Sequence, residues 1–200
     1  MACYCTLTLL SITDQRPRHC RINPISVIGF ALLTAERNAV TWSFDMVSEV
    51  VLHPADEPRL LERLADNLPP ADHLLGWQVE RDVVSPLLVA AERCSPVLRH
   101  FLLGRLARAR VGNAIDLAID FGGPRAPPFA KVALGRPVVE HVQPRAAIEA
   151  QWRARDTQAV AAALRVEALA LWLSFITSAP RAITDDVVAS TDSWAAGWLR

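Results

Sequence analysis

The hydrophobic pattern of the chain changes its period once, and this change limits what the chain can fold into. Near the N-terminus, short apolar runs and threonines alternating with apolar residues predict three strands, over residues 5–11, 25–33 and 39–44. Residues 36–38 are suited to a hairpin turn between the last two strands. Beyond them the leucines recur at helical spacing, at Leu60, Leu61, Leu64 and Leu68. Three strands followed by a helix predict an α/β or α+β domain.

Prolines divide the rest of the chain into further elements. Asp56 is placed to cap the leucine-rich helix, and Pro69-Pro70 ends it. Residues 73–77 then predict a short fourth strand, while the concentration of glycine and proline at 122–128 predicts a loop. Serine followed by proline is a common helix start, and alanine-rich segments favour helix. These patterns predict three more helices, over residues 85–93, 95–110 and 145–174.

Length and composition are those of one globular domain. The chain has 200 residues, of which 52% are hydrophobic, and we expect one domain over 1–180 followed by a tail at 181–200. The apolar stretch at 168–179 is too short to span a bilayer, and the N-terminus lacks the features of a secretory signal. We therefore expect a cytoplasmic protein without membrane association. A formal net charge of zero favours no class of partner.

The cysteines do not form a recognisable framework. Four cysteines in a chain of this length do not indicate a set of disulfides. Cys3, Cys5 and Cys20, with His19, could be drawn as a zinc site, but the usual spacing of two residues between paired cysteines is missing. We expect no zinc there.

One segment concentrates positive charge. Arg99, Arg105 and Arg108 lie in a stretch without acidic residues, which suits binding of a single-stranded nucleic acid. Phe101 is the only aromatic residue in this stretch that could stack on a base. The alternative is that these arginines form the solvated face of an amphipathic helix.

Three short motifs resemble, in order and spacing, those of DEDD-type 3′–5′ exonucleases related to the proofreading domain of B-family DNA polymerases. They are Gly76-Trp77-Gln78 through Asp82, Asn113 through Leu117 with Asp116, and Gln151-Trp152 through Asp156. The resemblance covers roughly residues 5–175. It implies a ribonuclease-H-like α/β fold, with a mixed sheet of about five strands, the first three antiparallel, flanked by helices.

The resemblance also assigns roles to individual residues. Asp82 and Asp156 take the places of metal ligands for Mg²⁺ or Mn²⁺, and Trp152 takes the place of the catalytic tyrosine. Trp77 and Gln78 would contact the nucleic acid. Each also has a plainer reading: Asp82 as a helix cap, Asp156 as a surface carboxylate, and the two tryptophans as core or cleft-wall aromatics.

Several atoms that the chemistry needs are missing. Ser11 and Thr13 stand where the family has two carboxylates, so two cations would lack most of their ligands. An indole N–H cannot act as a base, so Trp152 cannot replace a tyrosine, and Gln151 stands where a sister class has histidine. An active exonuclease would need another acid to complete the site, from among Asp14, Asp45 and Asp116.

Three functions therefore stay open. The first is an exonuclease-like domain that binds nucleic acid but is catalytically impaired. The second is an active metal-dependent exonuclease acting on DNA or RNA ends. The third is a structural or protein-interaction domain, which could form a homo-oligomer through apolar residues such as Trp194 and Trp198.

Overall fold

The five strands form one mixed sheet. The computed structural model describes residues 2–13, 25–38, 41–110, 114–132, 141–178 and 184–198. The strands are β1 (Ala2–Thr13), β2 (Ile25–Arg37), β3 (Trp42–Val50), β4 (His73–Gly76) and β5 (Ala114–Asp116), in the order β3-β2-β1-β4-β5. The first three are antiparallel, whereas β4 is parallel to β1 and β5 is parallel to β4. The expected α/β class and mixed sheet, with its first three strands antiparallel, are confirmed.

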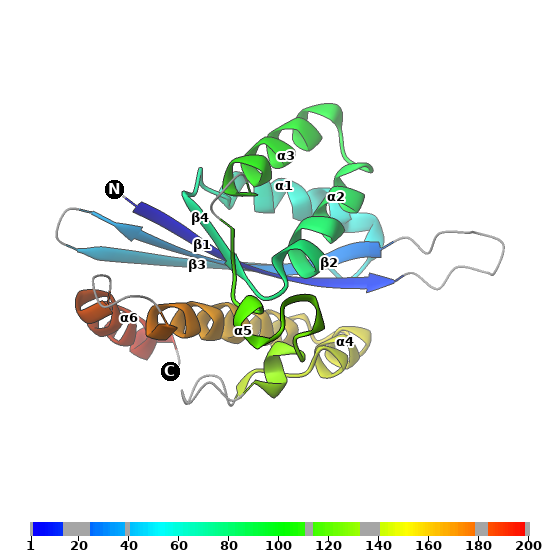
Figure 1. Ribbon diagram of the computed structural model, residues 1–200. Coiled ribbons are helices and arrows are strands. Elements are labelled where there is room, and N and C mark those ends of the chain that lie inside the picture. Colours follow the sequence, from blue (N-terminus) through cyan, green and yellow to red (C-terminus); the bar gives the residue numbers. More distant parts are fainter. Residues whose placement is uncertain are drawn as a thin grey trace.

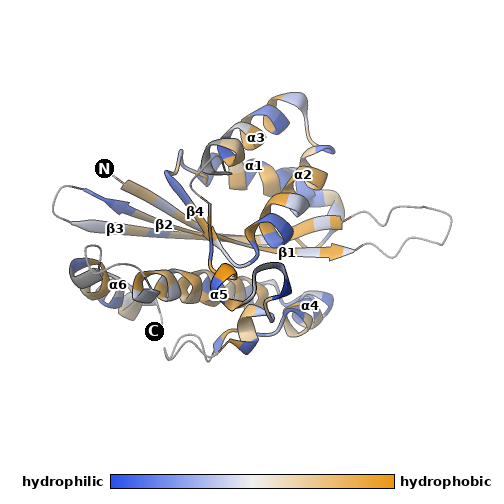
Figure 2. Cartoon of the chain, in the orientation of Figure 1, coloured by the Kyte–Doolittle hydropathy of each residue, from blue (hydrophilic) through white to orange (hydrophobic). Residues whose placement is uncertain are grey.

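Helices cover both faces of the sheet (Figure 1). One layer contains α1 (Glu57–Asn67), α2 (Ser85–Ala91) and α3 (Pro96–Arg110). The other contains α4 (Arg145–Arg153), α5 (Thr157–Ser178) and α6 (Thr184–Trp198). Because both faces are covered, β1 and β2 are buried along most of their length, and apolar residues predominate in both (Figure 2).

The core lies on both sides of β1 and β2. Its largest fully buried side chains include Trp172 of α5 and Phe30 of β2, with leucines from the strands and α1. The indole N–H of Trp172 donates to the Thr191 hydroxyl of α6 over 3.1 Å. α6 thus packs into the domain, with Val187 and Ala195 buried, in a segment expected only as a tail.

The long helix α5 is apolar enough to raise the question of a membrane. Its 22 residues could cross a bilayer by length and composition, but 61% of the apolar window is buried inside the protein. It packs along β1, β2 and β3 (Figure 1). These features are consistent with the core helix of a soluble protein.

The third strand and the last predicted helix differ from the sequence expectation. The third strand, predicted over 39–44, runs from Trp42 to Val50, because the chain first turns with the Asn38 N–H donating to the Thr41 carbonyl. The helix predicted over 145–174 is two helices, α4 and α5. The break falls at Arg155, whose φ of 63° is left-handed. Residues with a left-handed conformation at a helix end are usually glycine, so the arginine at this position did not indicate a break.

Helix starts follow the predicted chemistry in part. The Ser95 hydroxyl caps α3 by accepting from the Leu98 N–H over 3.3 Å. Asp56 precedes α1 but makes no side-chain cap. The neighbouring Glu57 is drawn instead into the core, where it accepts from the Val27 N–H.

Candidate functional site

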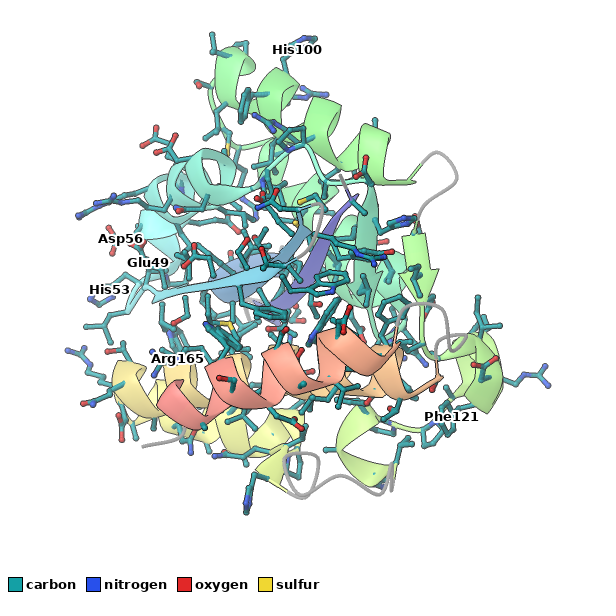
Figure 3. The ribbon with its side chains drawn as sticks, turned by 90° about the vertical axis from the view of Figure 1, so that its left-hand side faces the viewer. Glu49, His53, Asp56, His100, Phe121 and Arg165 are labelled. Carbon is teal, nitrogen blue, oxygen red and sulfur yellow. The ribbon has the colours of Figure 1, made fainter. Side chains whose placement is uncertain are left out.

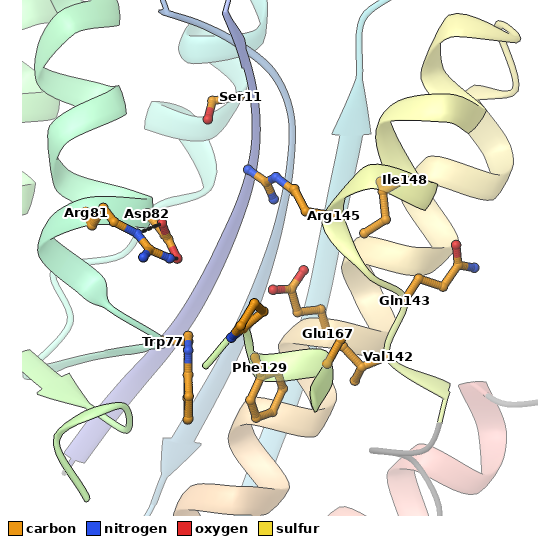
Figure 4. A pocket seen from close by; sticks show the side chains of 12 residues that line it. Ser11, Trp77, Arg81, Asp82, Phe129, Val142, Gln143, Arg145, Ile148 and Glu167 are labelled. Atoms are coloured by element: carbon orange, nitrogen blue, oxygen red, sulfur yellow. Dashed lines mark hydrogen bonds and ion pairs between the residues drawn. The ribbon is translucent and has the colours of Figure 1, made fainter. Parts of the chain in front are cut away.

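A cavity opens where β4 ends and β1 continues. β4 stops at Gly76, whereas β1 runs on to Thr13, so among the described residues no strand lies beside the last part of β1 on this edge. The cavity has a volume of about 260 Å³. It lies between the two helical layers (Figure 4). Its lining includes Ser11, Trp77, Asp82, Phe129, Arg145 and Glu167.

The turn after β4 is fixed by Asp116 at the end of β5. One oxygen of the Asp116 carboxylate accepts from the Gln78 N–H over 2.8 Å and from the Ala118 N–H over 3.0 Å. Gln78 has a φ of 48°, an unfavourable conformation for a residue with a side chain. The carboxylate thus joins the ends of two parallel strands and holds the strained turn in place.

Trp77 and Gln78 hold the loop that walls the cavity. The Gln78 amide donates to the carbonyls of Gly123 and Ala126, over 3.3 and 3.1 Å. The Trp77 indole donates to the Pro127 carbonyl over 3.1 Å, and its ring packs against Phe129 at 5.1 Å between centroids. Both side chains are buried. Trp77 reaches the cavity, whereas Gln78 supports the loop from within.

Asp82 is engaged by its neighbour in sequence. It lies in the π-helical turn Glu80–Val84 that leads into α2. Its two oxygens accept from the Arg81 guanidinium, over 2.7 Å from Nε and 2.8 Å from Nη2. This hydrogen-bonded pair raises the pKa of Arg81. Asp82 does not cap α2.

Glu167 was not among the expected site residues. It lies within α5 and lines the cavity from the layer opposite Asp82. Burial raises the pKa of its carboxyl from 4.5 to about 7, while the Arg145 charge opposes the shift and the Asp82 charge adds to it. Its position could have indicated a role, because an acidic residue within a mostly apolar helix is unusual.

Arg145 begins α4 and completes the charged group. Figure 4 shows its side chain extending across the cavity toward Arg81 and Asp82, with the Glu167 carboxyl directed toward it. Within the described part of the chain, no hydrogen bond or ion pair holds its guanidinium. The cavity therefore combines two guanidinium groups with two carboxyls.

The structure does not bring Asp156 and Trp152 into this cavity. Asp156 caps α5, its carboxylate accepting from the Ala159 N–H over 2.9 Å. The Trp152 indole donates to the Val51 carbonyl over 2.8 Å, beside the end of β3. Asp156 precedes Glu167 by eleven residues, about 16 Å along a helix. Neither residue lines the space that contains Asp82.

Of the described acids that might complete a metal site, Asp45 and Asp116 do not line the cavity beside Asp82. Asp45 is on β3, at the far edge of the sheet, and the Asp116 carboxylate already accepts two backbone N–H groups. Asp14 lies outside the described residues. Within the described ranges, no group of three or more His, Cys, Asp or Glu residues could hold a metal ion. A donor set of two carboxyls beside two arginines does not fit two divalent cations.

The basic patch on α3 is separate from the cavity. Arg99 pairs with Glu92 over 2.8 Å, and the Arg105 guanidinium lies 4.8 Å from the centre of the Phe101 ring. The side chain of Arg108 lies outside the described residues. The grooves beside α3 share no lining residue with the cavity, and His100 points away from the sheet (Figure 3).

The residues considered for a zinc site are described only in part. Cys3 and Cys5 are buried in β1, whereas His19 and Cys20 lie outside the described residues.

Comparison of the chain with protein-family models, curated proteins and solved structures gives no match.

Proposed function

We propose that the chain is a ribonuclease-H-like domain, related to the DEDD exonucleases, that binds the end of a nucleic-acid strand in the cytoplasm without hydrolysing it. The strand order β3-β2-β1-β4-β5, with β4 and β5 parallel to β1, supports this relationship. So does the order of the three motifs along the chain.

The observation that carries the proposal is the position of the cavity. In open α/β sheets, ligands bind outside the carboxyl ends of the parallel strands. β4 ends beside this cavity, and the turn after β4, which Asp116 ties to the end of β5, supplies Trp77 and Asp82 to its lining. Its volume of about 260 Å³ is below the 300–1,000 Å³ typical of sites for drug-sized ligands. A single terminal nucleotide suits a space of this size better than a duplex.

Two features argue against hydrolysis. Phosphodiester hydrolysis by two cations needs several carboxylates close together, and here both oxygens of Asp82 are paired with Arg81. The attacking water also needs a base. Trp152 has only an N–H, and that group is bound to the Val51 carbonyl. Mg²⁺ and Mn²⁺ therefore have no part in the proposed activity.

The α3 patch contributes charge rather than specificity. Arg105 remains beside an aromatic ring, an arrangement suited to a phosphate backbone or a stacked base. Because Arg99 is paired with Glu92, the patch is less positive than its sequence indicates. We expect it to strengthen binding at low salt and to add little at high salt.

Blocking the cavity tests the proposal. Ala130 lines the cavity, and Ala130→Phe would fill part of it. The matched control is Ala150→Phe, on the exposed surface of α4 and outside the lining. Fluorescence anisotropy with a labelled single-stranded oligonucleotide should show weaker binding for the first variant only. Equal binding by both variants and the unmodified protein would place the strand elsewhere.

The alternative of an interaction domain has one specific observation in its favour. Val97, Ile119 and Phe121 are large apolar side chains exposed on the surface, and Val97 is 81% exposed. A homo-oligomer through such residues would appear as a doubled mass in light scattering. The alternative of an active exonuclease requires a further acid, for which Asp14 is the remaining sequence candidate.

A further inference from the structure

The charges of the cavity are arranged for an anion. Arg81 and Arg145 contribute two positive charges, and Asp82 contributes one negative charge. Glu167 contributes a carboxyl whose pKa is raised by burial, which favours its neutral form. With two guanidinium groups beside two carboxyls the cavity is not negative, whereas a site for two divalent cations must be strongly negative.

The two guanidinium groups come from opposite layers. Arg81 follows β4, in the turn leading into α2, and Asp82 holds its planar group in a fixed orientation. Arg145 is the first residue of α4 and reaches into the cavity from the other side (Figure 4). The first N–H groups and the dipole of this helix add positive potential at the same end. A phosphate group between the layers would be near both arginines.

We propose that Arg81 and Arg145 replace divalent cations in this cavity, so that it binds a terminal phosphate group of a nucleic-acid strand without metal. This inference rests on the proposed function and specifies its ligand. Arginine forms paired hydrogen bonds to phosphate oxygens, and a terminal phosphate carries more negative charge than an internal phosphodiester.

The remaining walls suit the nucleoside that carries the phosphate. Phe129 and Ile148 are buried and line the cavity, as does Trp77. Aromatic faces stack on any base, so this part of the site would not select a sequence. The Ser11 hydroxyl, on β1, can both donate and accept, and would serve a phosphate or sugar oxygen.

The test measures inorganic phosphate binding by isothermal titration calorimetry in buffer containing EDTA. We expect the unmodified protein to bind. Arg145→Gln should bind about tenfold or more weakly, because charge-assisted hydrogen bonds are lost. Arg153→Gln is the matched control, since Arg153 is exposed, lies on the same helix and pairs with Glu149. Circular dichroism confirms folding. Binding that appears only when Mg²⁺ is added would overturn the inference, as would equal binding by both variants.

Oligonucleotides separate this inference from the proposed function. Three strands of one sequence, with a 3′-phosphate, a 5′-phosphate or no terminal phosphate, are compared in EDTA. Tighter binding of one phosphorylated strand supports the inference and identifies the end. Equal binding of all three overturns it, while the proposed function stands. If inorganic phosphate binds and no strand does, the inference and the proposed function both fail.

Discussion

The Arg81 guanidinium makes two hydrogen bonds to the Asp82 carboxylate, 2.7 and 2.8 Å long, at the position that the proposed resemblance to DEDD exonucleases assigns to a metal ligand. An arginine thus occupies both oxygens that a cation would need. The pair is exposed, with 62% and 39% of the two side chains accessible to solvent. Its two parallel hydrogen bonds, and not burial, fix the orientation of the two groups. This relationship separates the present site from that of a two-metal nuclease.

Removal of the Asp82 carboxylate should therefore not abolish binding. Asp82→Ala frees Arg81, adds net positive charge to the cavity, and should leave strand affinity unchanged or higher. The free energy of unfolding should change by less than about 1 kcal/mol, since exposed ion pairs contribute little. Anisotropy titrations and urea unfolding measure both quantities. A large loss of affinity in EDTA would contradict this expectation and would show that binding needs the Asp82 carboxylate, either directly or to orient Arg81.

Glu167 should make stability depend on pH. Its folded pKa of about 7 lies above its ordinary value of 4.5, so its contribution is fully present below pH 4.5 and is lost as pH rises toward 7. Across this window the unmodified protein should lose about 1–3 kcal/mol relative to Glu167→Gln, allowing for partial solvent screening. Urea unfolding at several pH values gives the difference. A constant difference between the two proteins would contradict the assignment.

Glu57 and Arg93 form the pair on which stability should depend most. Glu57 is 2% exposed and accepts from the Val27 N–H over 2.6 Å and from Arg93 over 2.7 and 2.9 Å. Glu57→Gln should lower the free energy of unfolding by about 2–4 kcal/mol, because a partly buried arginine loses its charge partner. The control is Glu49→Gln, which removes an exposed contact of 3.9 Å to Arg63 and should cost little. Similar losses for both variants would be the contrary result.

Asp116 should control the loop that walls the cavity. Asp116→Ala leaves the Gln78 and Ala118 N–H groups without their acceptor, at a cost of about 1–3 kcal/mol. The loop contains Arg125 and Lys131, both sites for trypsin, so limited proteolysis there should become faster. Asp120→Ala, an exposed change in the same segment, is the control. Unchanged cleavage in Asp116→Ala would show that the loop is held by other contacts.

Much of the sheet could be predicted because the spacing of apolar residues along the sequence indicates buried strands. β1 and β2 are buried on both faces, and strands were indicated by threonines alternating with apolar residues in β1 and by the apolar run in β2. The start of α3 could also be predicted, because a serine followed by proline is a common helix start and Ser95 caps this helix. These features depend on residues that are close together in the sequence, so a sequence pattern is enough to predict them.

The site was harder to predict because it depends on which elements meet. Glu167 and Asp82 are far apart in sequence, and only the packing of α5 beneath β1 brings both to one cavity. The motif around Asp156 predicted that this residue is a metal ligand. In the structure the chain turns at Arg155, in a left-handed conformation, and Asp156 caps the helix that follows. Asp116, weighed as a replacement for missing acids, instead fixes the turn at Gln78. Local patterns do not contain this information.

The most direct test of the central claim is to incubate the protein with a 5′-labelled single strand, in EDTA and in Mg²⁺ or Mn²⁺, and to measure bound fraction and strand length together. We predict that the bound fraction is equal in EDTA, Mg²⁺ and Mn²⁺ and that the strand is not shortened. A ladder of shorter products that requires the cation, and disappears in Asp82→Ala, would contradict it and would establish an active exonuclease.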